Sequence, residues 1–73
     1  MWLSQEAIEI LTMLKANKGQ MFSVKEVSRR ISRPKFEKDH LWARSILGLL
    51  FENGEVERDN SGFYYIPKEE LSF

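Results

Sequence analysis

The sequence predicts a small α+β domain in which three helices are followed by a two-stranded β-hairpin. Apolar residues recur every three or four positions in three separate segments, as they do on the buried face of a helix. Near the C-terminus, two short runs of β-branched and aromatic residues flank a turn-forming tetrapeptide. A chain of 73 residues can close one hydrophobic core, so we expect one domain over residues 1–67 and a tail over residues 68–73.

The first helix is expected from about Gln5 to Ala16. Ser4 fits the N-cap position, where its hydroxyl accepts a hydrogen bond from a free N–H of the first turn. The segment Asn17-Lys18-Gly19 supplies a stop signal. The apolar residues with helical spacing are Leu3, Ala7, Ile10, Leu11 and Leu14.

A second, shorter helix is expected from Val24 to about Ile31. Ser23 and Glu26 have the spacing of a capping box, in which the serine and glutamate side chains each bind the backbone N–H of the other residue. Val24, Val27 and Ile31 would then face the core.

A connector and a third helix follow. Residues 32–38 break the helical period, and Pro34 disfavours helical geometry at the residue before it, so we expect an irregular connector there. Asp39 is placed to cap a helix that continues to about Asn53, with Gly54 at the left-handed stop position. The apolar residues on one face of this helix are Ala43, Ile46, Leu47 and Leu50.

The C-terminal part predicts a hairpin. The β-prone runs are residues 56–58 and 63–66, and Asp59-Asn60-Ser61-Gly62 lies between them. Pro67 ends the second run because proline has no N–H to give to a sheet.

The order of elements, with the run Leu47-x-x-Leu50-x-x-x-Gly54-x-Val56-x-Arg58, resembles a winged helix-turn-helix domain. In this pattern the leucines lie on the core face of the last helix, Gly54 reverses the chain, Val56 tucks under the helix and Arg58 begins the wing. The resemblance covers nearly the whole chain and implies double-stranded DNA as the partner. It places the third helix in the major groove and the hairpin wing beside the duplex, as in a transcriptional regulator or an accessory DNA-binding protein.

Charge is distributed unevenly along a chain whose formal net charge is zero. Residues 21–44 carry seven basic and three acidic side chains, a net charge of +4, and residues 45–73 carry two basic and six acidic ones, a net charge of −4. The basic side chains that we expect on phosphates are Arg29, Arg30, Arg33, Lys35 and Lys38. The alternative is a solvated face that keeps the domain soluble.

The outward face of the third helix supplies the remaining candidate DNA contacts. Arg44 can pair with a guanine edge or a phosphate, and Ser45 can donate or accept. Gly48 costs on the order of 1 kcal/mol relative to alanine inside a helix, which suggests the close approach of another backbone, from DNA or from a protein. A replacement without consequence is the other interpretation of Gly48. His40 and Leu41 lie near the start of the same face.

Two departures from the family pattern keep a protein-docking module open as an alternative. The connector is longer than the tight turn of a simple helix-turn-helix. The wing tip, residues 59–62, carries no basic residue to bind a phosphate. In the docking alternative, Leu41 and Gly48 would meet a protein partner. Trp2, Ile8 and Met13 flank the core stripe of the first helix and suggest a homodimer contact, or else Trp2 alone covers the core.

The aromatic residues also allow two interpretations. They are Trp42, Phe51, Phe63, Tyr64 and Tyr65. They can serve as stacking platforms for single-stranded bases. Packing in the core and hairpin is the interpretation we favour, because each residue belongs to an element that needs burial.

Catalysis, cofactors and metals find no support in the sequence. The chain has no cysteine, and His40 beside Asp39 falls short of the three or four ligands of a metal site. No glycine-rich phosphate loop is present, and no apolar run approaches the length of a membrane span. We therefore expect a cytoplasmic, non-enzymatic protein with no cofactor, no small-molecule substrate and no membrane contact.

Overall fold

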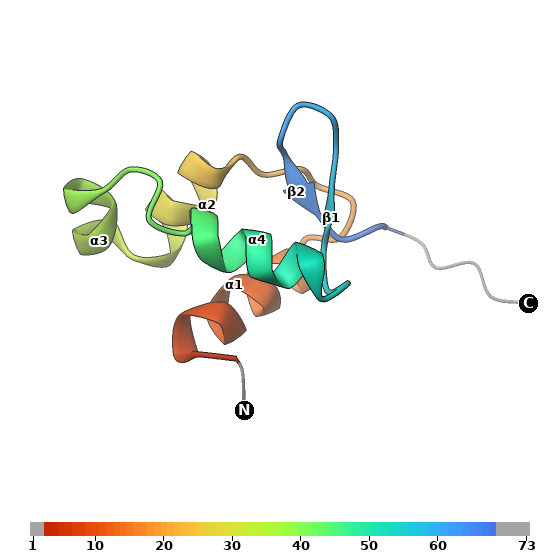
Figure 1. Ribbon diagram of the computed structural model, residues 1–73, viewed down its shortest axis with the longest axis horizontal. Helices are drawn as coiled ribbons and strands as arrows, with labels where there is room; N and C mark the ends of the chain where they lie inside the picture. Colours follow the sequence, from red (N-terminus) through yellow and green to blue (C-terminus); the bar gives the residue numbers. More distant parts are fainter. Residues whose placement is uncertain (1–2, 69–73) are drawn as a thin grey trace, which may run out of the picture.

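Four helices and one hairpin make up the part of the chain that the computed structural model describes, residues 3–68. They are α1 (Gln5–Ala16), α2 (Val24–Ile31), α3 (Arg33–Lys38), α4 (Arg44–Glu52), β1 (Glu57–Arg58) and β2 (Tyr64–Tyr65). In Figure 1, α3 lies at one end of the molecule, α1 lies below α4, and the hairpin projects on the side away from α1. The α+β class is confirmed, and the three expected helices have become four.

Helix α1 has the predicted bounds and the predicted cap. Ser4 is extended, and its hydroxyl accepts a hydrogen bond from the backbone N–H of Ala7 at 3.1 Å. Four of the five residues of the predicted core face are buried, and Leu3 and Met13 are partly buried and pack against the core. Ile8 is exposed. Trp2, which we expected in a dimer contact or over the core, lies outside the described residues.

The turn after α1 packs against the residues that follow β2. Gly19 has a φ of +86°, and its N–H donates to the carbonyl of Ile66 at 2.7 Å. A Cβ at this position would lie 2.9 Å from the Cβ of Lys68, so the close approach requires glycine. Phe22 and Tyr64 then exchange backbone hydrogen bonds of 2.9 and 2.8 Å, which adds a third short stretch beside β2.

Helix α2 also has the predicted bounds, but only half of its capping box forms. The Ser23 hydroxyl accepts from the N–H of Glu26 at 3.0 Å. The carboxylate of Glu26 turns away from the helix start and binds Arg29 and Arg30 instead. These partners are charged and only three and four residues away, and a charge-assisted hydrogen bond is stronger than one to a neutral N–H.

The prediction of an irregular connector is wrong, because residues 33–38 form α3. The Ser32 hydroxyl accepts from the N–H of Lys35 at 3.4 Å, and Pro34 lies in the first turn, where its missing N–H has no intrahelical partner to lose. Pro34 therefore marks the start of a helix and does not exclude one.

The predicted start of the last helix is wrong as well. Residues 40–43 form a turn, and α4 begins at Arg44. Asp39 does cap this turn, since its carboxylate accepts from the N–H of Leu41 at 3.0 Å. Ala43 occupies the N-cap position of α4 and offers no side-chain hydrogen bond of its own.

The hairpin forms where the sequence predicts it. Glu57 pairs with Tyr65 and Arg58 with Tyr64 in antiparallel register. The carboxylate of Asp59 accepts from the N–H groups of Ser61 and Phe63 at 2.9 and 2.8 Å, which closes the turn. The helices and this hairpin establish the α+β class. The identity of the hairpin as a wing remains a prediction.

One core lies between α1, α2, α4 and the hairpin. Its buried residues include the three apolar residues of the motif that suggested the fold, Leu47, Leu50 and Val56. Ile46 is only half-buried. Within residues 3–68 no helix combines the length and the apolar character needed to cross a bilayer.

Candidate nucleic-acid interface

The two predicted basic residues of α2 share one carboxylate. Arg29 and Arg30 each bind Glu26 at 2.5 Å, and both side chains are about half exposed. Arg30 also lies with its guanidinium carbon 5.3 Å from the ring centre of Phe22. The hydrogen bond from Arg29, followed by that from Arg30, lowers the pKa of Glu26. A phosphate that binds here has to compete with an ionised carboxylate.

The three basic residues predicted in the connector lie on α3, and two of them also form ion pairs with carboxylates. Arg33 lies 3.8 Å from Glu37, and Lys35 binds Glu6 of α1. The ammonium of Lys35 is 5.0 Å from the ring centre of Trp42. Lys38 alone among the five predicted phosphate contacts has no carboxylate partner within the described part of the chain.

The remaining predicted residues lie at the surface around the start of α4. The His40 ring stacks on Phe36 with the ring centres 4.4 Å apart. Leu41, Arg44 and Ser45 are exposed. A Cβ added to Gly48 would meet no atom of the chain within 4 Å, so nothing in the fold requires glycine at that position.

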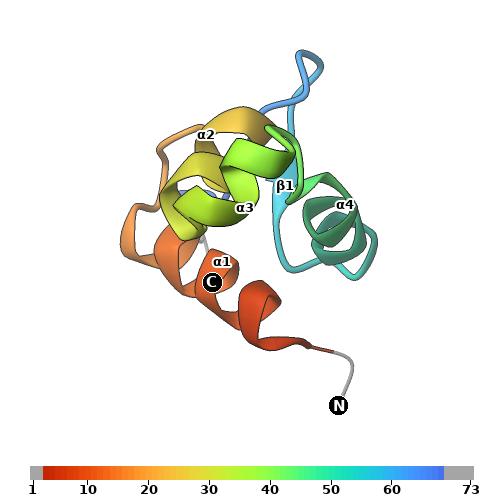
Figure 2. The ribbon, with the colours of Figure 1, turned by 90° about the vertical axis from the view of Figure 1, so that its left-hand side faces the viewer.

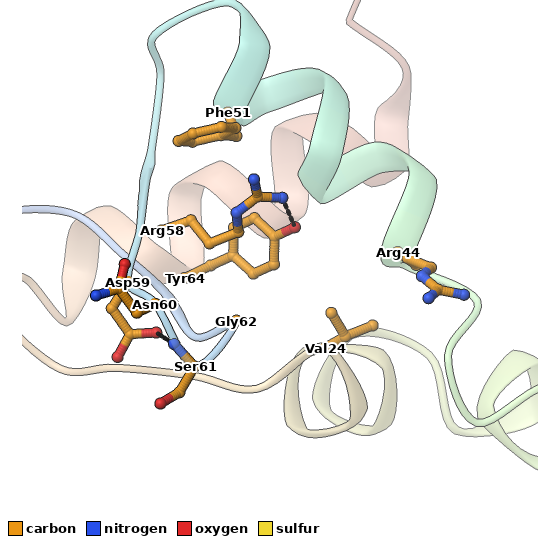
Figure 3. A pocket seen from close by; sticks show the side chains of 9 residues that line it. All are labelled: Val24, Arg44, Phe51, Arg58, Asp59, Asn60, Ser61, Gly62 and Tyr64. Atoms are coloured by element: carbon orange, nitrogen blue, oxygen red, sulfur yellow. Dashed lines mark hydrogen bonds between the residues drawn. The ribbon is translucent and has the colours of Figure 1, made fainter.

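A cleft of about 690 Å³ opens between α4 and the hairpin. Figure 3 shows Arg44 at the first turn of α4 beside Val24, and Arg58 beneath the ring of Phe51. These are the two basic residues of the lining, and the lining contains one carboxylate, that of Asp59. The lining residues are Val24, Arg44, Phe51, Arg58, Asp59, Asn60, Ser61, Gly62 and Tyr64.

Neither arginine of the cleft has a carboxylate partner among residues 3–68. The carboxylate of Asp59 is engaged by two backbone N–H groups of the turn. The cleft is therefore lined by two arginines from two different elements, and no ion pair within residues 3–68 neutralises either charge.

Contacts on either side hold Arg58 in place. Its guanidinium carbon lies 4.3 Å from the ring centre of Phe51 and 6.0 Å from that of Tyr64, and one guanidinium nitrogen is 3.5 Å from the Tyr64 hydroxyl. Arg58 was expected at the start of the hairpin but not among the DNA contacts. The register of the hairpin could have indicated this position. Arg58 pairs with the inward-facing Tyr64, so its side chain points to the same face of the hairpin, where α4 packs.

The structure separates the aromatic residues into two groups. Tyr64 is buried, and Phe51 and Trp42 pack against the core, as the packing interpretation predicts. Phe63 and Tyr65 flank Tyr64 in sequence, so they point to the opposite face of the hairpin. Phe63 is exposed there and Tyr65 is half-buried.

Polar groups show no sign of an unfilled metal site in residues 3–68. No three side chains of histidine, aspartate or glutamate come together there in a way that would hold a metal ion. Every buried polar side-chain atom in the same residues has a hydrogen-bond partner.

Comparisons with known proteins add no assignment: no family model, no curated protein and no solved structure matches this chain.

Proposed function

We propose that this domain binds double-stranded DNA, with the exposed side of α4 toward the major groove and with Arg44 and Arg58 on phosphates. The observation that carries the proposal is that these two arginines line one cleft and lack carboxylate partners among the described residues. A planar guanidinium offers a fork of N–H donors that matches two oxygens of a phosphate. Two such forks on separate elements give the cleft a preference for a polyanion.

The fixed position of Arg58 supports this role. Its stacking on Phe51 limits the conformations of the side chain before any ligand arrives. Binding then costs less side-chain entropy than it would for a freely moving arginine. The contact with Phe51 still leaves guanidinium N–H groups for an anion, because these groups lie in the guanidinium plane and the ring lies over its face.

The first two turns of the outward side of α4 fit the proposal because small side chains follow Arg44 there, whereas Glu52 on the same side lies at the C-terminal end of the helix. Ser45 and Gly48 follow Arg44 on this side, and both leave the helix backbone accessible. The major groove of B-DNA admits a helix, and the serine hydroxyl can form hydrogen bonds with base edges.

The basic residues of α2 and α3 have a smaller part in this proposal than the sequence suggested. A phosphate gains less from Arg29 or Arg30 when it must first displace Glu26. The same holds for Lys35, which binds Glu6. Lys38 is the member of this group that has no competing carboxylate within residues 3–68.

Anisotropy titrations of a labelled mixed-sequence duplex at low salt test the proposal. Arg44→Ala and Arg58→Ala should each weaken binding by about tenfold, the size expected for the loss of one charge-assisted hydrogen-bonding group. Arg33→Ala is the matched control, since it removes the same charge from a paired arginine on α3. The proposal fails if the duplex does not bind, or if all three variants bind alike.

A protein-docking module is the second candidate, and exposed leucines on and before α4 favour it. Leu41 and Leu49 are each 43% exposed. In this case Leu41→Asp blocks association with the protein partner, whereas Arg44→Ala and Arg58→Ala have little effect. Absence of duplex binding at low salt, where electrostatic attraction is strongest, would favour this second function.

A further inference from the structure

Helix α4 depends on a side chain of another helix at its N-terminal end. Ala43 stands at the N-cap position and has no capping side chain. Its backbone N–H donates instead to the hydroxyl of Ser28 in α2, at 3.0 Å. Ser28 is completely buried, so this bond is shielded from water.

Trp42, the residue before Ala43, donates a second hydrogen bond to the same serine. The indole N–H of Trp42 donates to the backbone carbonyl of Ser28 at 2.8 Å. That carbonyl also accepts from the N–H of Ser32 at 3.4 Å, a long bond that closes the last turn of α2. Two consecutive residues before α4 thus bind the hydroxyl and the carbonyl of one residue in α2.

Trp42 also contacts α3, which is joined to α1 by an ion pair. The ammonium of Lys35 in α3 lies 5.0 Å from the indole ring centre, and Lys35 binds Glu6 of α1. In Figure 2, α3 faces the viewer, with α2 above and behind it, α1 below it and α4 on the right. The segment that leads into α4 is therefore fixed from α2 and α3 together.

We propose that Ser28 and Trp42 are positioning residues that set the orientation of α4, and with it the direction of Arg44, for phosphate binding. Arg44 directly follows Ala43, whose N–H Ser28 holds, and its side chain lines the cleft. Ser28 is buried and cannot itself touch DNA. The proposal rests on the proposed function, because it assigns these two residues to the site that contains Arg44.

The geometry explains why two bonds are needed. Successive residues of a helix differ by about 100° around its axis, so a shift of the first turn by one residue carries Arg44 away from the cleft. One hydrogen bond would fix a distance and still allow rotation about it. Two bonds from consecutive residues to different atoms of Ser28 fix both the distance and the rotation.

The first test uses the free protein and does not depend on DNA. Ser28→Ala removes the hydroxyl acceptor, so hydrogen exchange of the Ala43 amide should become at least about tenfold faster, the equivalent of removing one hydrogen bond. The exchange of the Leu14 amide in α1, followed in the same sample, reports any general loss of stability. Thr12→Ala, at an exposed position of α1, is the control variant. Unchanged relative exchange of Ala43 would overturn the inference.

The second test is a double-mutant cycle on duplex affinity. Ser28→Ala should weaken binding by about fivefold in the wild-type and Arg58→Ala proteins, and hardly at all in Arg44→Ala, because coupled residues are not additive. Equal losses in all three backgrounds would mean that Ser28 only stabilises the domain, and the positioning role would be rejected.

Trp42→Phe supplies a second variant in case Ser28→Ala does not fold, since it keeps one aromatic ring and removes the indole N–H donor together with part of the ring system. If Arg44→Ala leaves duplex affinity unchanged, the proposed function fails at that contact while the inference stays testable. Residual dipolar couplings of α4 relative to α2 then decide. A changed orientation in Ser28→Ala or Trp42→Phe supports the positioning role, and an unchanged orientation overturns it.

Discussion

Arg58 places its guanidinium carbon 4.3 Å from the ring centre of Phe51, so the hairpin and α4 meet through a cation–π contact at the edge of the cleft. The Tyr64 hydroxyl lies 3.5 Å from the same guanidinium group. One arginine thus joins the two walls of the candidate site and also presents charge within it.

Phe51→Leu should loosen the hairpin without opening a large hole in the core. The variant keeps an apolar side chain and removes the π face, with a cost of about 0.5–1 kcal/mol for an exposed cation–π contact. Heteronuclear NOEs of residues 59–62 should fall, and duplex affinity should fall less than in Arg58→Ala. Hairpin NOEs equal to those of the wild type would contradict a clamp between Arg58 and Phe51.

Gly48→Ala should stabilise the free domain by about 1 kcal/mol, because alanine is the better helix former and its Cβ meets nothing within 4 Å. Gly54→Ala is the informative comparison. That glycine also has open space around it, but its φ is +78°, so alanine there should destabilise by about 1 kcal/mol. Urea unfolding measures both changes.

Duplex binding by Gly48→Ala gives a second result from the same protein. If α4 approaches DNA closely at Gly48, the added methyl group weakens binding although the fold is more stable. A variant that is more stable and binds as tightly as the wild type would place the DNA away from this part of α4.

Leu50→Ala and Leu49→Ala test the orientation of α4. Leu50 is fully buried and Leu49 is 43% exposed, although the two residues are adjacent. The buried leucine should cost about 2–5 kcal/mol, a large part of the stability of so small a domain. The exposed leucine should change stability by less than about 0.5 kcal/mol. Similar losses in the two variants would mean that α4 packs differently.

Acid should weaken the ion pair at Glu26 in a defined direction. The hydrogen bond from Arg29, with that from Arg30, lowers the pKa of this carboxyl in the folded protein. Its contribution to stability is therefore complete above the ordinary glutamate pKa of about 4.3 and is lost as the pH falls through the lowered folded value. Glu26→Gln should show a smaller drop in melting temperature between pH 5 and pH 3 than the wild type does. An identical drop would assign the acid sensitivity to other carboxyl groups, such as Glu6.

Local patterns predicted the regular elements of this protein well. Ser4 and Ser23 mark the starts of α1 and α2, and each hydroxyl accepts the expected backbone hydrogen bond. The hairpin turn follows from the preference of Asp59 for binding N–H groups two and four residues ahead. These features depend on neighbours in sequence, which is why the sequence reveals them.

The candidate site was harder to predict because it depends on residues far apart in the chain. Sequence alone could not show that Glu6 reaches Lys35, 29 residues later, and neutralises a predicted phosphate contact. It also could not show that Arg58 meets Phe51 across the space between the hairpin and α4. The hydrogen bond that holds the residue before α4 was missed for the same reason, because its acceptor is Ser28 in another helix.

The salt dependence of duplex affinity tests the central claim most directly. Removing one phosphate-binding side chain should make the log–log slope of affinity against salt less negative by about 0.9. We expect duplex binding by the wild type to weaken as salt rises from about 50 to 200 mM, and the slope of the Arg44→Ala, Arg58→Ala double variant to be less negative by about 1.8. A double variant with the wild-type slope, alongside an Arg29→Ala, Arg30→Ala protein with the reduced one, would contradict the claim and place the phosphates on α2.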